Sequence, residues 1–192
     1  MRQVQTLRSM KIPNITIHGR FQPPLHVNHR NYAMDAFSRA EKVTILITNP
    51  YLDESAVSEA NHRNKKENNP FTYDERVEIF KKYFDKIGIK ESKYEFKPFD
   101  ITDEDNWDKV LDRKVPNLVN VYGEWSESKW RKLKGRGFRV IRTDNPKEVP
   151  VSGSLIRSII SENCPVDDKK KKLIDVGYVP EAIDGLFSVL QG

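Results

Sequence analysis

A six-residue run rich in β-branched side chains constrains the fold of this chain more than any other segment. Residues 43–48 read VTILIT and contain no charged side chain. Such a run is typical of a strand buried on both faces, as in a parallel sheet covered by helices. Residues 15–17, 94–99, 118–122 and 138–142 are further strand candidates.

Segments with helical periodicity lie between these strands. After Asn28 the apolar residues fall three or four positions apart, and Thr72 with Glu75 forms a capping-box pattern before a second apolar stripe. Further helices are expected at 106–111, 126–134 and 155–160. Because strand and helix alternate five times, we predict an α/β fold. It should be a doubly wound, Rossmann-like parallel sheet of about five strands with helices on both faces.

The length of 192 residues fits one domain of ordinary size. We expect a single domain over residues 14–192, preceded by an N-terminal extension at 1–13. Residues 164–192 carry a weak helical pattern and are expected to form a small helical appendage of the same domain. Residues 49–70 break the alternation and predict a long loop, whose role the sequence leaves open.

Composition narrows the class of protein. Lys plus Arg number 33 against 28 Asp plus Glu, a net charge of +5 whose charges are interspersed along the chain. This pattern favours an enzyme that handles phosphates over a protein that coats nucleic acid. The single cysteine, Cys164, excludes an intramolecular disulfide and a cysteine zinc site. Without a long apolar run or a secretory signal, we expect a cytoplasmic protein with no membrane or nucleic-acid partner. The sequence leaves open whether the protein forms a homo-oligomer.

The turn after the first strand candidate carries the strongest chemical signal. Residues 19–29 read GRFQPPLHVNH, which places a glycine and two histidines at the carboxyl end of a strand where a helix begins. Ligands of open α/β sheets bind at that edge, and a helix N-terminus adds positive potential for an anion. His26 and His29 are three positions apart, so both side chains can point the same way and donate to phosphate oxygens.

This turn resembles the GRFQPxHxGH signature of the nucleotidyltransferase superfamily, and most closely that of the archaeal-type nicotinamide mononucleotide adenylyltransferases. Three later segments are similar to further motifs of that family. Residues 69–76 (NPFTYDER) resemble NPFTxxER, residues 151–157 (VSGSLIR) resemble ISxTxxR, and residues 179–183 (VPEAI) resemble LPxxV. The resemblance covers roughly residues 14–187, with the motifs in the family's order.

The resemblance implies a reaction and a set of site residues. A nucleoside monophosphate would pass from a nucleoside triphosphate, with ATP favoured, to the phosphate of a small acceptor such as nicotinamide mononucleotide, and pyrophosphate would leave. The catalytic residues would be His26, His29 and Arg157. The nucleotide-binding residues would be Gly19, Arg20, Phe21, Gln22, Ser152, Gly153 and Ser154. Mg²⁺ would be bound mainly through the triphosphate, and no residue is assigned to a metal.

Three positions depart from the family pattern. The family glycine between the histidines is Asn28, which we expect to act as a helix N-cap, and the family threonine of the later motif is Ser154. Residues 122–125 (YGEW) replace a short Gly/Asn element after the fourth strand. We take Arg76, Glu124 and Trp125 as candidates for binding the acceptor.

Other readings remain open at this point. The nearest is a CTP-dependent cytidylyltransferase that acts on a phosphonate or another small phosphorylated metabolite, because the same motifs serve both bases. An aminoacyl-tRNA synthetase fragment is disfavoured, since the chain has no lysine-rich KMSKS-type loop. A catalytically silent nucleotide- or RNA-binding module is disfavoured because His26, His29, Arg20 and Arg157 are all present.

Overall fold

The structure is a computed structural model that describes residues 11–50, 66–100, 103–120, 123–143 and 150–191. Five parallel strands form one sheet in these residues. They are β1 (Ile12–Gly19), β2 (Ala40–Thr48), β3 (Tyr94–Phe99), β4 (Asn117–Asn120) and β5 (Val140–Thr143). The predicted doubly wound parallel sheet is therefore confirmed, with strand bounds that differ from the predicted ones by a few residues.

Seven α-helices accompany the sheet in the described residues. They are α1 (Val27–Arg39), α2 (Tyr73–Lys86), α3 (Trp107–Val110), α4 (Gly123–Gly135), α5 (Gly153–Ser161), α6 (Val166–Asp175) and α7 (Ile183–Gln191). Short 3₁₀ turns lie at Lys66–Asn68, Glu91–Lys93, Glu104–Asn106 and Pro180–Ala182. The capping box predicted at α2 is present, because Thr72 Oγ1 accepts from Glu75 N and Glu75 accepts from Thr72 N.

The order of the strands places a switch point in the middle of the sheet. The spatial order is β3-β2-β1-β4-β5, so β1 has β2 on one side and β4 on the other. The chain leaves β1 towards one half of the sheet and leaves β4 towards the other half. The carboxyl ends of β1 and β4 therefore border a crevice, which is where open α/β sheets bind their ligands.

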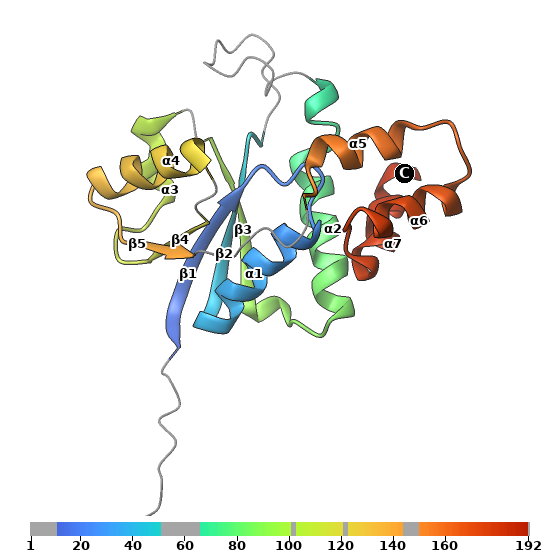
Figure 1. Cartoon of the computed structure of the whole chain (residues 1–192). Coiled ribbons are helices and arrows are strands. Elements are labelled where there is room, and N and C mark those ends of the chain that lie inside the picture. Colours follow the sequence, from blue (N-terminus) through green and yellow to red (C-terminus); the bar gives the residue numbers. More distant parts are fainter. Residues whose placement is uncertain (1–10, 51–65, 101–102, 121–122, 144–149, 192) are drawn as a thin grey trace, which may run out of the picture.

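Apolar side chains fill both faces of the sheet. One face carries Ile15, Ile17 and Ile45 under α1 and α2, and these residues belong to the larger buried cluster. The other face carries Leu46 and Phe99 in a second cluster with residues of α3 and α4. Figure 1 shows the two helix pairs on opposite sides of the sheet. Helices on both faces were predicted from the uninterrupted apolar run of β2, and this arrangement confirms them.

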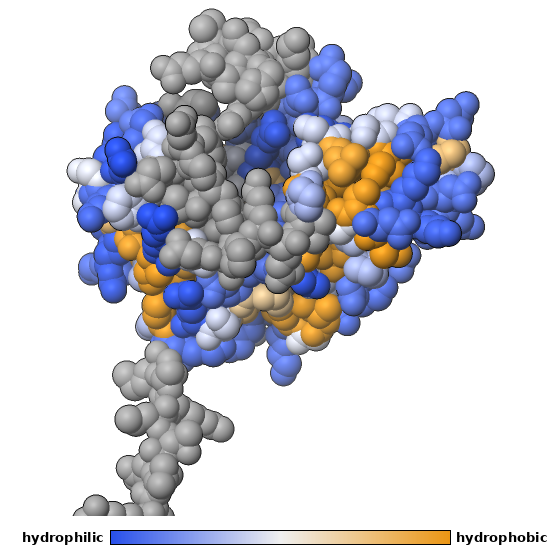
Figure 2. Space-filling model, viewed as in Figure 1, coloured by the Kyte–Doolittle hydropathy of each residue, from blue (hydrophilic) through white to orange (hydrophobic). Residues whose placement is uncertain are grey.

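The last three helices pack beside α2. Leu173, Leu186 and Phe187 of α6 and α7 are buried in the same apolar cluster as β1 and β2, and Figure 1 shows these helices grouped next to α2. Figure 2 shows apolar surface over this region, and its helices contribute four exposed apolar side chains, Leu155, Val166, Ile174 and Leu190. Scattered apolar residues are normal on protein surfaces, so a homo-oligomer stays a prediction.

No helix in the described part of the chain is long and apolar enough to cross a membrane.

Candidate active site

The two histidines of the turn lie against each other at the start of α1. His26 is the N-cap residue of α1, and His29 lies in the first turn of that helix. Their ring centroids are 3.6 Å apart and their planes are 25° from parallel. The spacing of three residues therefore places both imidazoles together at the helix N-terminus, beside the carboxyl end of β1. Two imidazoles at a helix N-terminus can donate hydrogen bonds to one polyanion when they are protonated.

His29 lies in an environment that opposes its protonation. The ring of Phe21 contacts it edge-on, with 4.9 Å between centroids. Burial, with smaller contributions from the positive charges of His26 and Arg20, holds the pKa of His29 well below its usual value of 6.5. Its Nδ1 atom is buried and has no hydrogen-bond partner among the described residues. Burial therefore disfavours the protonated ring, and a bound negative charge would favour it.

Gly19 and Phe21 shape the turn rather than offering donors. A Cβ atom on Gly19 would lie 2.8 Å from the ring of Phe21, so glycine lets this ring fold back over the end of β1. Phe21 is 2% exposed and also packs edge-on against Phe80 of α2, at 5.1 Å between centroids. Its contacts in the structure are with protein side chains. Nucleotide binding by Gly19 and Phe21 stays a prediction.

Gln22 ties the turn to the segment that precedes α2. Its Nε2 donates to the carbonyl of Phe71 at 2.7 Å, and its Oε1 accepts from the amide of Phe71 at 3.2 Å. The side chain is only 3% exposed. With both ends of its amide committed to one backbone residue, Gln22 acts here as a brace between two loops. Its contact with the nucleotide stays a prediction.

Arg76 is a second brace, although the sequence suggested acceptor binding. The side chain is 1% exposed, and its guanidinium donates at 2.7–3.0 Å to four backbone carbonyls, those of Arg20, Thr48, Asn49 and Thr72. Burial lowers the pKa of Arg76 to about 10. A guanidinium whose donors are committed to the backbone has little left for a substrate. The contacts favour a structural role, and acceptor binding by Arg76 stays untested.

The N-terminus of α5 approaches the turn closely. A Cβ atom on Gly153 would lie 2.4 Å from the carbonyl oxygen of Gln22, which is closer than real atoms come. Ser152 is the N-cap of α5, and its hydroxyl accepts from the amide of Leu155 at 3.2 Å. Ser152 and Ser154 are both exposed. Their hydroxyls therefore lie at a helix N-terminus that is open to solvent and docked against the turn.

Arg157 connects three segments around this contact. It donates to the carbonyl of Gln22 at 2.7 Å, to Ser154 Oγ at 3.0 Å and to Asn68 Oδ1 at 3.2 Å. The side chain is 9% exposed, and burial lowers its pKa. The structure places its guanidinium between α5 and the turn. A direct contact of Arg157 with phosphates stays a prediction.

Asn28 does not cap α1, so the sequence prediction was wrong on this point. The helix begins at Val27 with His26 as its N-cap, and no side chain supplies the capping hydrogen bond. Asn28 occupies the second helical position and is 9% exposed. The physical reason is that the extended residue before the helix is His26, whose carbonyl accepts from the amides of His29 and Arg30.

Glu124 and Trp125 lie within the bounds of α4, but their side chains are outside the described residues. Their predicted roles in acceptor binding therefore stay predictions. Residues 51–65 of the predicted long loop are also outside the described part of the chain.

The sequence analysis missed one feature of the turn. The signature GRFQPxHxGH has two residues between its glutamine and first histidine, whereas this chain has three, Pro23, Pro24 and Leu25. Leu25 is fully buried and adopts the left-handed conformation, with φ of +68°. Counting the spacing of the motif would have revealed the extra residue, although not its conformation.

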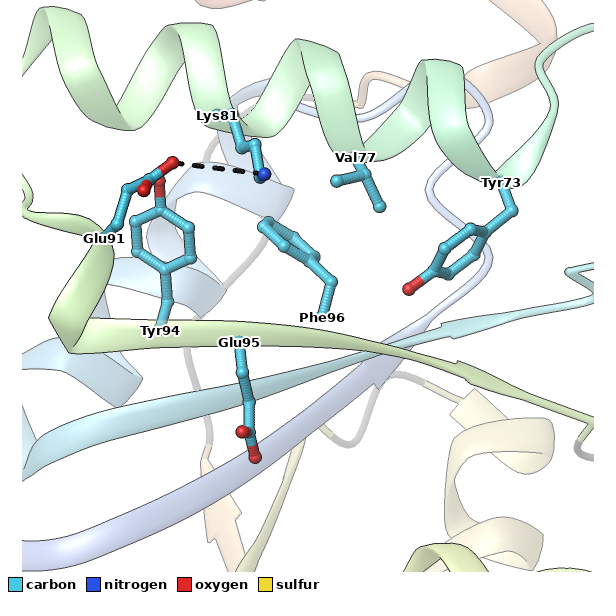
Figure 3. Close-up of a pocket in the computed structure, with 7 residues that line it drawn as sticks. All are labelled: Tyr73, Val77, Lys81, Glu91, Tyr94, Glu95 and Phe96. Atoms are coloured by element: carbon cyan, nitrogen blue, oxygen red, sulfur yellow. Dashed lines mark ion pairs between the residues drawn. The ribbon is translucent and has the colours of Figure 1, made fainter.

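A pocket of about 340 Å³ lies elsewhere, between α2 and the edge strand β3 (Figure 3). Its lining residues are Tyr73, Val77, Lys81, Glu91, Tyr94, Glu95 and Phe96. None of them belongs to the predicted site, and in Figure 3 the carboxylate of Glu95 points away from the other six. The histidine pair and the start of α5, rather than this pocket, therefore define the candidate site.

A family comparison agrees with this assignment. The family model described as cytidylyltransferase-like matches residues 16–159, which include the turn, the paired histidines and the start of α5. The chain belongs to the cytidylyltransferase-like family. This confirms at the family level the resemblance drawn from the motifs, and it makes the chain an enzyme of the nucleotidyltransferase class.

A curated relative of this cytidylyltransferase-like protein is the phosphonoformate cytidylyltransferase of Streptomyces viridochromogenes. The two are 28% identical over 152 residues, which span 78% of this chain and 81% of the relative. The aligned region therefore covers most of both proteins.

Two solved structures with the same fold come from Francisella tularensis. Both are of a bifunctional NMN adenylyltransferase/ADP ribose pyrophosphatase, and one of them is complexed with AMP and a manganese ion. The TM-scores are 0.54 and 0.55, at 17% and 16% identity, over 92% and 94% of this chain. This chain spans 52% and 54% of those two chains, about half their length. At such identities the likeness establishes the fold alone.

The close contact at Gly153 generates a first prediction. Gly153→Ala places a Cβ against the carbonyl of Gln22, so the start of α5 must move away from the turn and from the histidine pair. We expect pyrophosphate affinity, measured by calorimetry, to fall at least tenfold. Gly135→Ala is the matched control, because a Cβ there meets nothing within 4 Å. Equal affinities in the two variants would contradict the proposed approach of α5 to the anion site.

The environment of His29 generates a second prediction, on pH. Its pKa is lowered in the free protein, whereas a bound polyanion favours the protonated ring and raises that pKa. Binding of inorganic pyrophosphate should therefore take up a proton near neutral pH and weaken as the pH rises through the pKa of the bound state. In the free protein, the same lowered pKa means that stability falls as the pH drops below about 6.5.

Calorimetry in buffers with different ionisation enthalpies measures this proton uptake directly. We expect His29→Gln to reduce it, because glutamine keeps much of the side-chain volume and does not titrate. A binding enthalpy that is independent of the buffer in the wild-type protein would contradict the prediction.

Proposed function

We propose that this enzyme transfers a nucleoside monophosphate from a nucleoside triphosphate to a small acceptor that carries a phosphate or phosphonate group, and that it releases pyrophosphate. The observation that carries the proposal is the stacked pair His26 and His29 at the N-terminus of α1. The pair lies at the carboxyl end of β1, beside the switch point of the sheet. Positive charge and donors converge there, as a polyphosphate requires.

The reaction needs positioned donors more than a covalent group. An oxygen of the acceptor attacks the α-phosphorus, the bond from that phosphorus to the bridging oxygen breaks, and pyrophosphate departs with the electron pair. Negative charge accumulates on the α-phosphate oxygens and on the leaving group. In the proposal, protonated His26 and His29 donate to those oxygens, and Arg20 binds a phosphate beside them.

The start of α5 is proposed to hold the leaving group. The exposed hydroxyls of Ser152 and Ser154 lie at the N-terminus of this helix, where the backbone also favours an anion. We assign them to the β- and γ-phosphates. Arg157 is assigned to the same phosphates with its Nη2, which would exchange its hydrogen bonds to Ser154 and Asn68 for phosphate oxygens. Its Nη1 stays on the carbonyl of Gln22 and holds α5 against the turn.

Mg²⁺ fits this site as an ion held by the substrate. Among the described residues, no group of three or more His, Cys, Asp or Glu side chains is arranged to hold a metal. In the proposal the phosphate oxygens therefore supply most of the ligands, and the ion neutralises part of the triphosphate charge. A manganese ion and AMP accompany one of the Francisella structures.

For the donor and acceptor we propose CTP and a small phosphonate. The sequence analysis placed ATP and nicotinamide mononucleotide first, with CTP and a phosphonate as the alternative. The phosphonoformate cytidylyltransferase supports the alternative, because the match covers 81% of that protein. The adenylyltransferase structures share only the fold at 16–17% identity, so they support ATP less.

Pyrophosphate release over the four nucleoside triphosphates tests the proposal. Each triphosphate is combined with phosphonoformate, with nicotinamide mononucleotide and with no acceptor. We expect release with CTP and the phosphonate, and little release without an acceptor. Release only with ATP and nicotinamide mononucleotide would overturn the choice of CTP and a phosphonate as substrates. Release with none of the combinations would contradict the transferase assignment for these acceptor classes.

The same assay on His29→Ala tests the site. Removing one positioned donor to developing charge typically lowers turnover on the order of 10²–10³-fold. We expect a loss in that range, with a circular dichroism spectrum like that of the wild type. His29→Gln controls for the volume lost beside Phe21 and should be similarly slow, because it lacks an imidazole. Wild-type turnover in both variants would place His29 outside the chemistry.

A further inference from the structure

We propose that residues 177–179, between α6 and α7, are a positioning element of the active site that holds His26 from the C-terminal end of the chain. This inference rests on the proposed function, since it concerns the same histidine pair. The sequence suggested a small helical appendage in this region, with residues 179–183 resembling the LPxxV motif. The structure brings its backbone into direct contact with the catalytic turn.

Two backbone hydrogen bonds flank His26 and come from this segment. The amide of Val27 donates to the carbonyl of Gly177 at 2.9 Å, and the amide of Val179 donates to the carbonyl of Leu25 at 3.1 Å. They form an antiparallel bridge between His26 and Tyr178. The backbone of His26 is thus held on both of its sides, which fixes where its imidazole stacks on His29.

Leu25 needs this support. Its φ of +68° lies in the left-handed region, which a leucine rarely adopts. A residue keeps such a strained backbone conformation only when several surrounding contacts hold it there. The side chain of Leu25 is fully buried, and its carbonyl is held by Val179. Because Leu25 directly precedes His26, any relaxation of its backbone would move the N-cap of α1 and the imidazole that it carries.

The segment is itself firmly anchored. Tyr178 and Val179 are each 2% exposed and belong to the main apolar cluster. The amide of Tyr178 donates to Leu173 at 2.8 Å, and that of Gly177 donates to Ile174 at 2.9 Å, so the segment closes the end of α6. A rigid helix end therefore supports the turn. This arrangement can hold a strained residue in place without a covalent link.

Gly177 is the position where this support can be weakened. Its φ of +92° is accessible to glycine and strained for other residues, and asparagine tolerates the left-handed region best among them. Gly177→Ala should pull the carbonyl away from the amide of Val27 and release His26. Gly177→Asn should retain most of the native backbone. Comparing these two variants distinguishes the loss of the left-handed backbone conformation at position 177 from the effect of adding a side chain.

Gly88→Ala is a matched control at the end of α2. Gly88 has a φ of +77°, and a Cβ there meets nothing within 4 Å, so alanine introduces similar backbone strain far from the turn. We expect both alanine variants to lose a similar amount of thermal stability. With turnover expressed per folded enzyme, Gly177→Ala should lose at least tenfold in kcat with a smaller change in KM. Gly177→Asn should recover most of that loss, and Gly88→Ala should keep wild-type kcat.

A second measurement does not depend on activity. The ring protons of His26 and His29 experience each other's ring currents, so their ¹H–¹³C NMR signals report the stacking in the free protein. We expect these signals to shift in Gly177→Ala and to stay in place in Gly88→Ala. If both alanine variants keep the wild-type signals and the same kcat, residues 177–179 only stabilise the fold and the inference is wrong. If the signals shift in Gly177→Ala while the wild type shows no transfer, the inference stands and the proposed function fails.

Discussion

The buried guanidinium of Arg76 is the interaction on which the geometry of the site depends. It joins the carbonyls of Arg20, Thr48 and Asn49, which lie at or just after the ends of β1 and β2, to the first turn of α2. A loop carbonyl buried without a donor is costly, and so is a buried charge without acceptors. Here the guanidinium supplies the donors that the loop carbonyls need, and the carbonyls supply the acceptors that the buried charge needs. The carboxyl edge of the sheet can therefore carry irregular loops whose buried carbonyls are hydrogen-bonded.

The turn between β1 and α1 has no regular structure, yet three of its residues are fixed individually. Arg76 holds the carbonyl of Arg20, and Arg157 holds that of Gln22. The side chain of Gln22 binds Phe71, and Val179 holds the carbonyl of Leu25. These contacts come from four separate parts of the chain. A site held this way is positioned before its ligand arrives, which is the condition for effective electrostatic stabilisation of developing charge.

Much of the architecture follows from local patterns. The run at 43–48 and its alternation with helical segments predicted a parallel sheet, because a strand buried on both faces needs helices on both sides. The paired histidines were located because their spacing and the preceding strand are both local features. The roles of Gln22, Arg76 and Arg157 were not predictable in the same way. Their acceptors are mostly backbone carbonyls of distant loops. Every residue has a backbone carbonyl, so the residue types do not indicate which carbonyl will accept a hydrogen bond.

The hydrogen-bond partners of Arg76 and Arg157 leave positive charge at the site, as the proposed binding of a polyanion requires. In the described residues neither Arg76 nor Arg157 forms an ion pair, and the hydrogen bonds that they donate go to carbonyl, amide and hydroxyl oxygens. A carboxylate partner would have cancelled the charge of each guanidinium. Neutral acceptors satisfy the donors and leave the positive electrostatic potential in place. The retained positive charge has a cost, visible in the lowered pKa values of Arg76 and Arg157. Burial, with smaller contributions from His26 and Arg20, likewise lowers the pKa of His29. In the proposed function, a triphosphate that enters this site supplies the negative charge that these buried groups lack in the free protein, so part of the cost of burying them is recovered when the nucleotide binds.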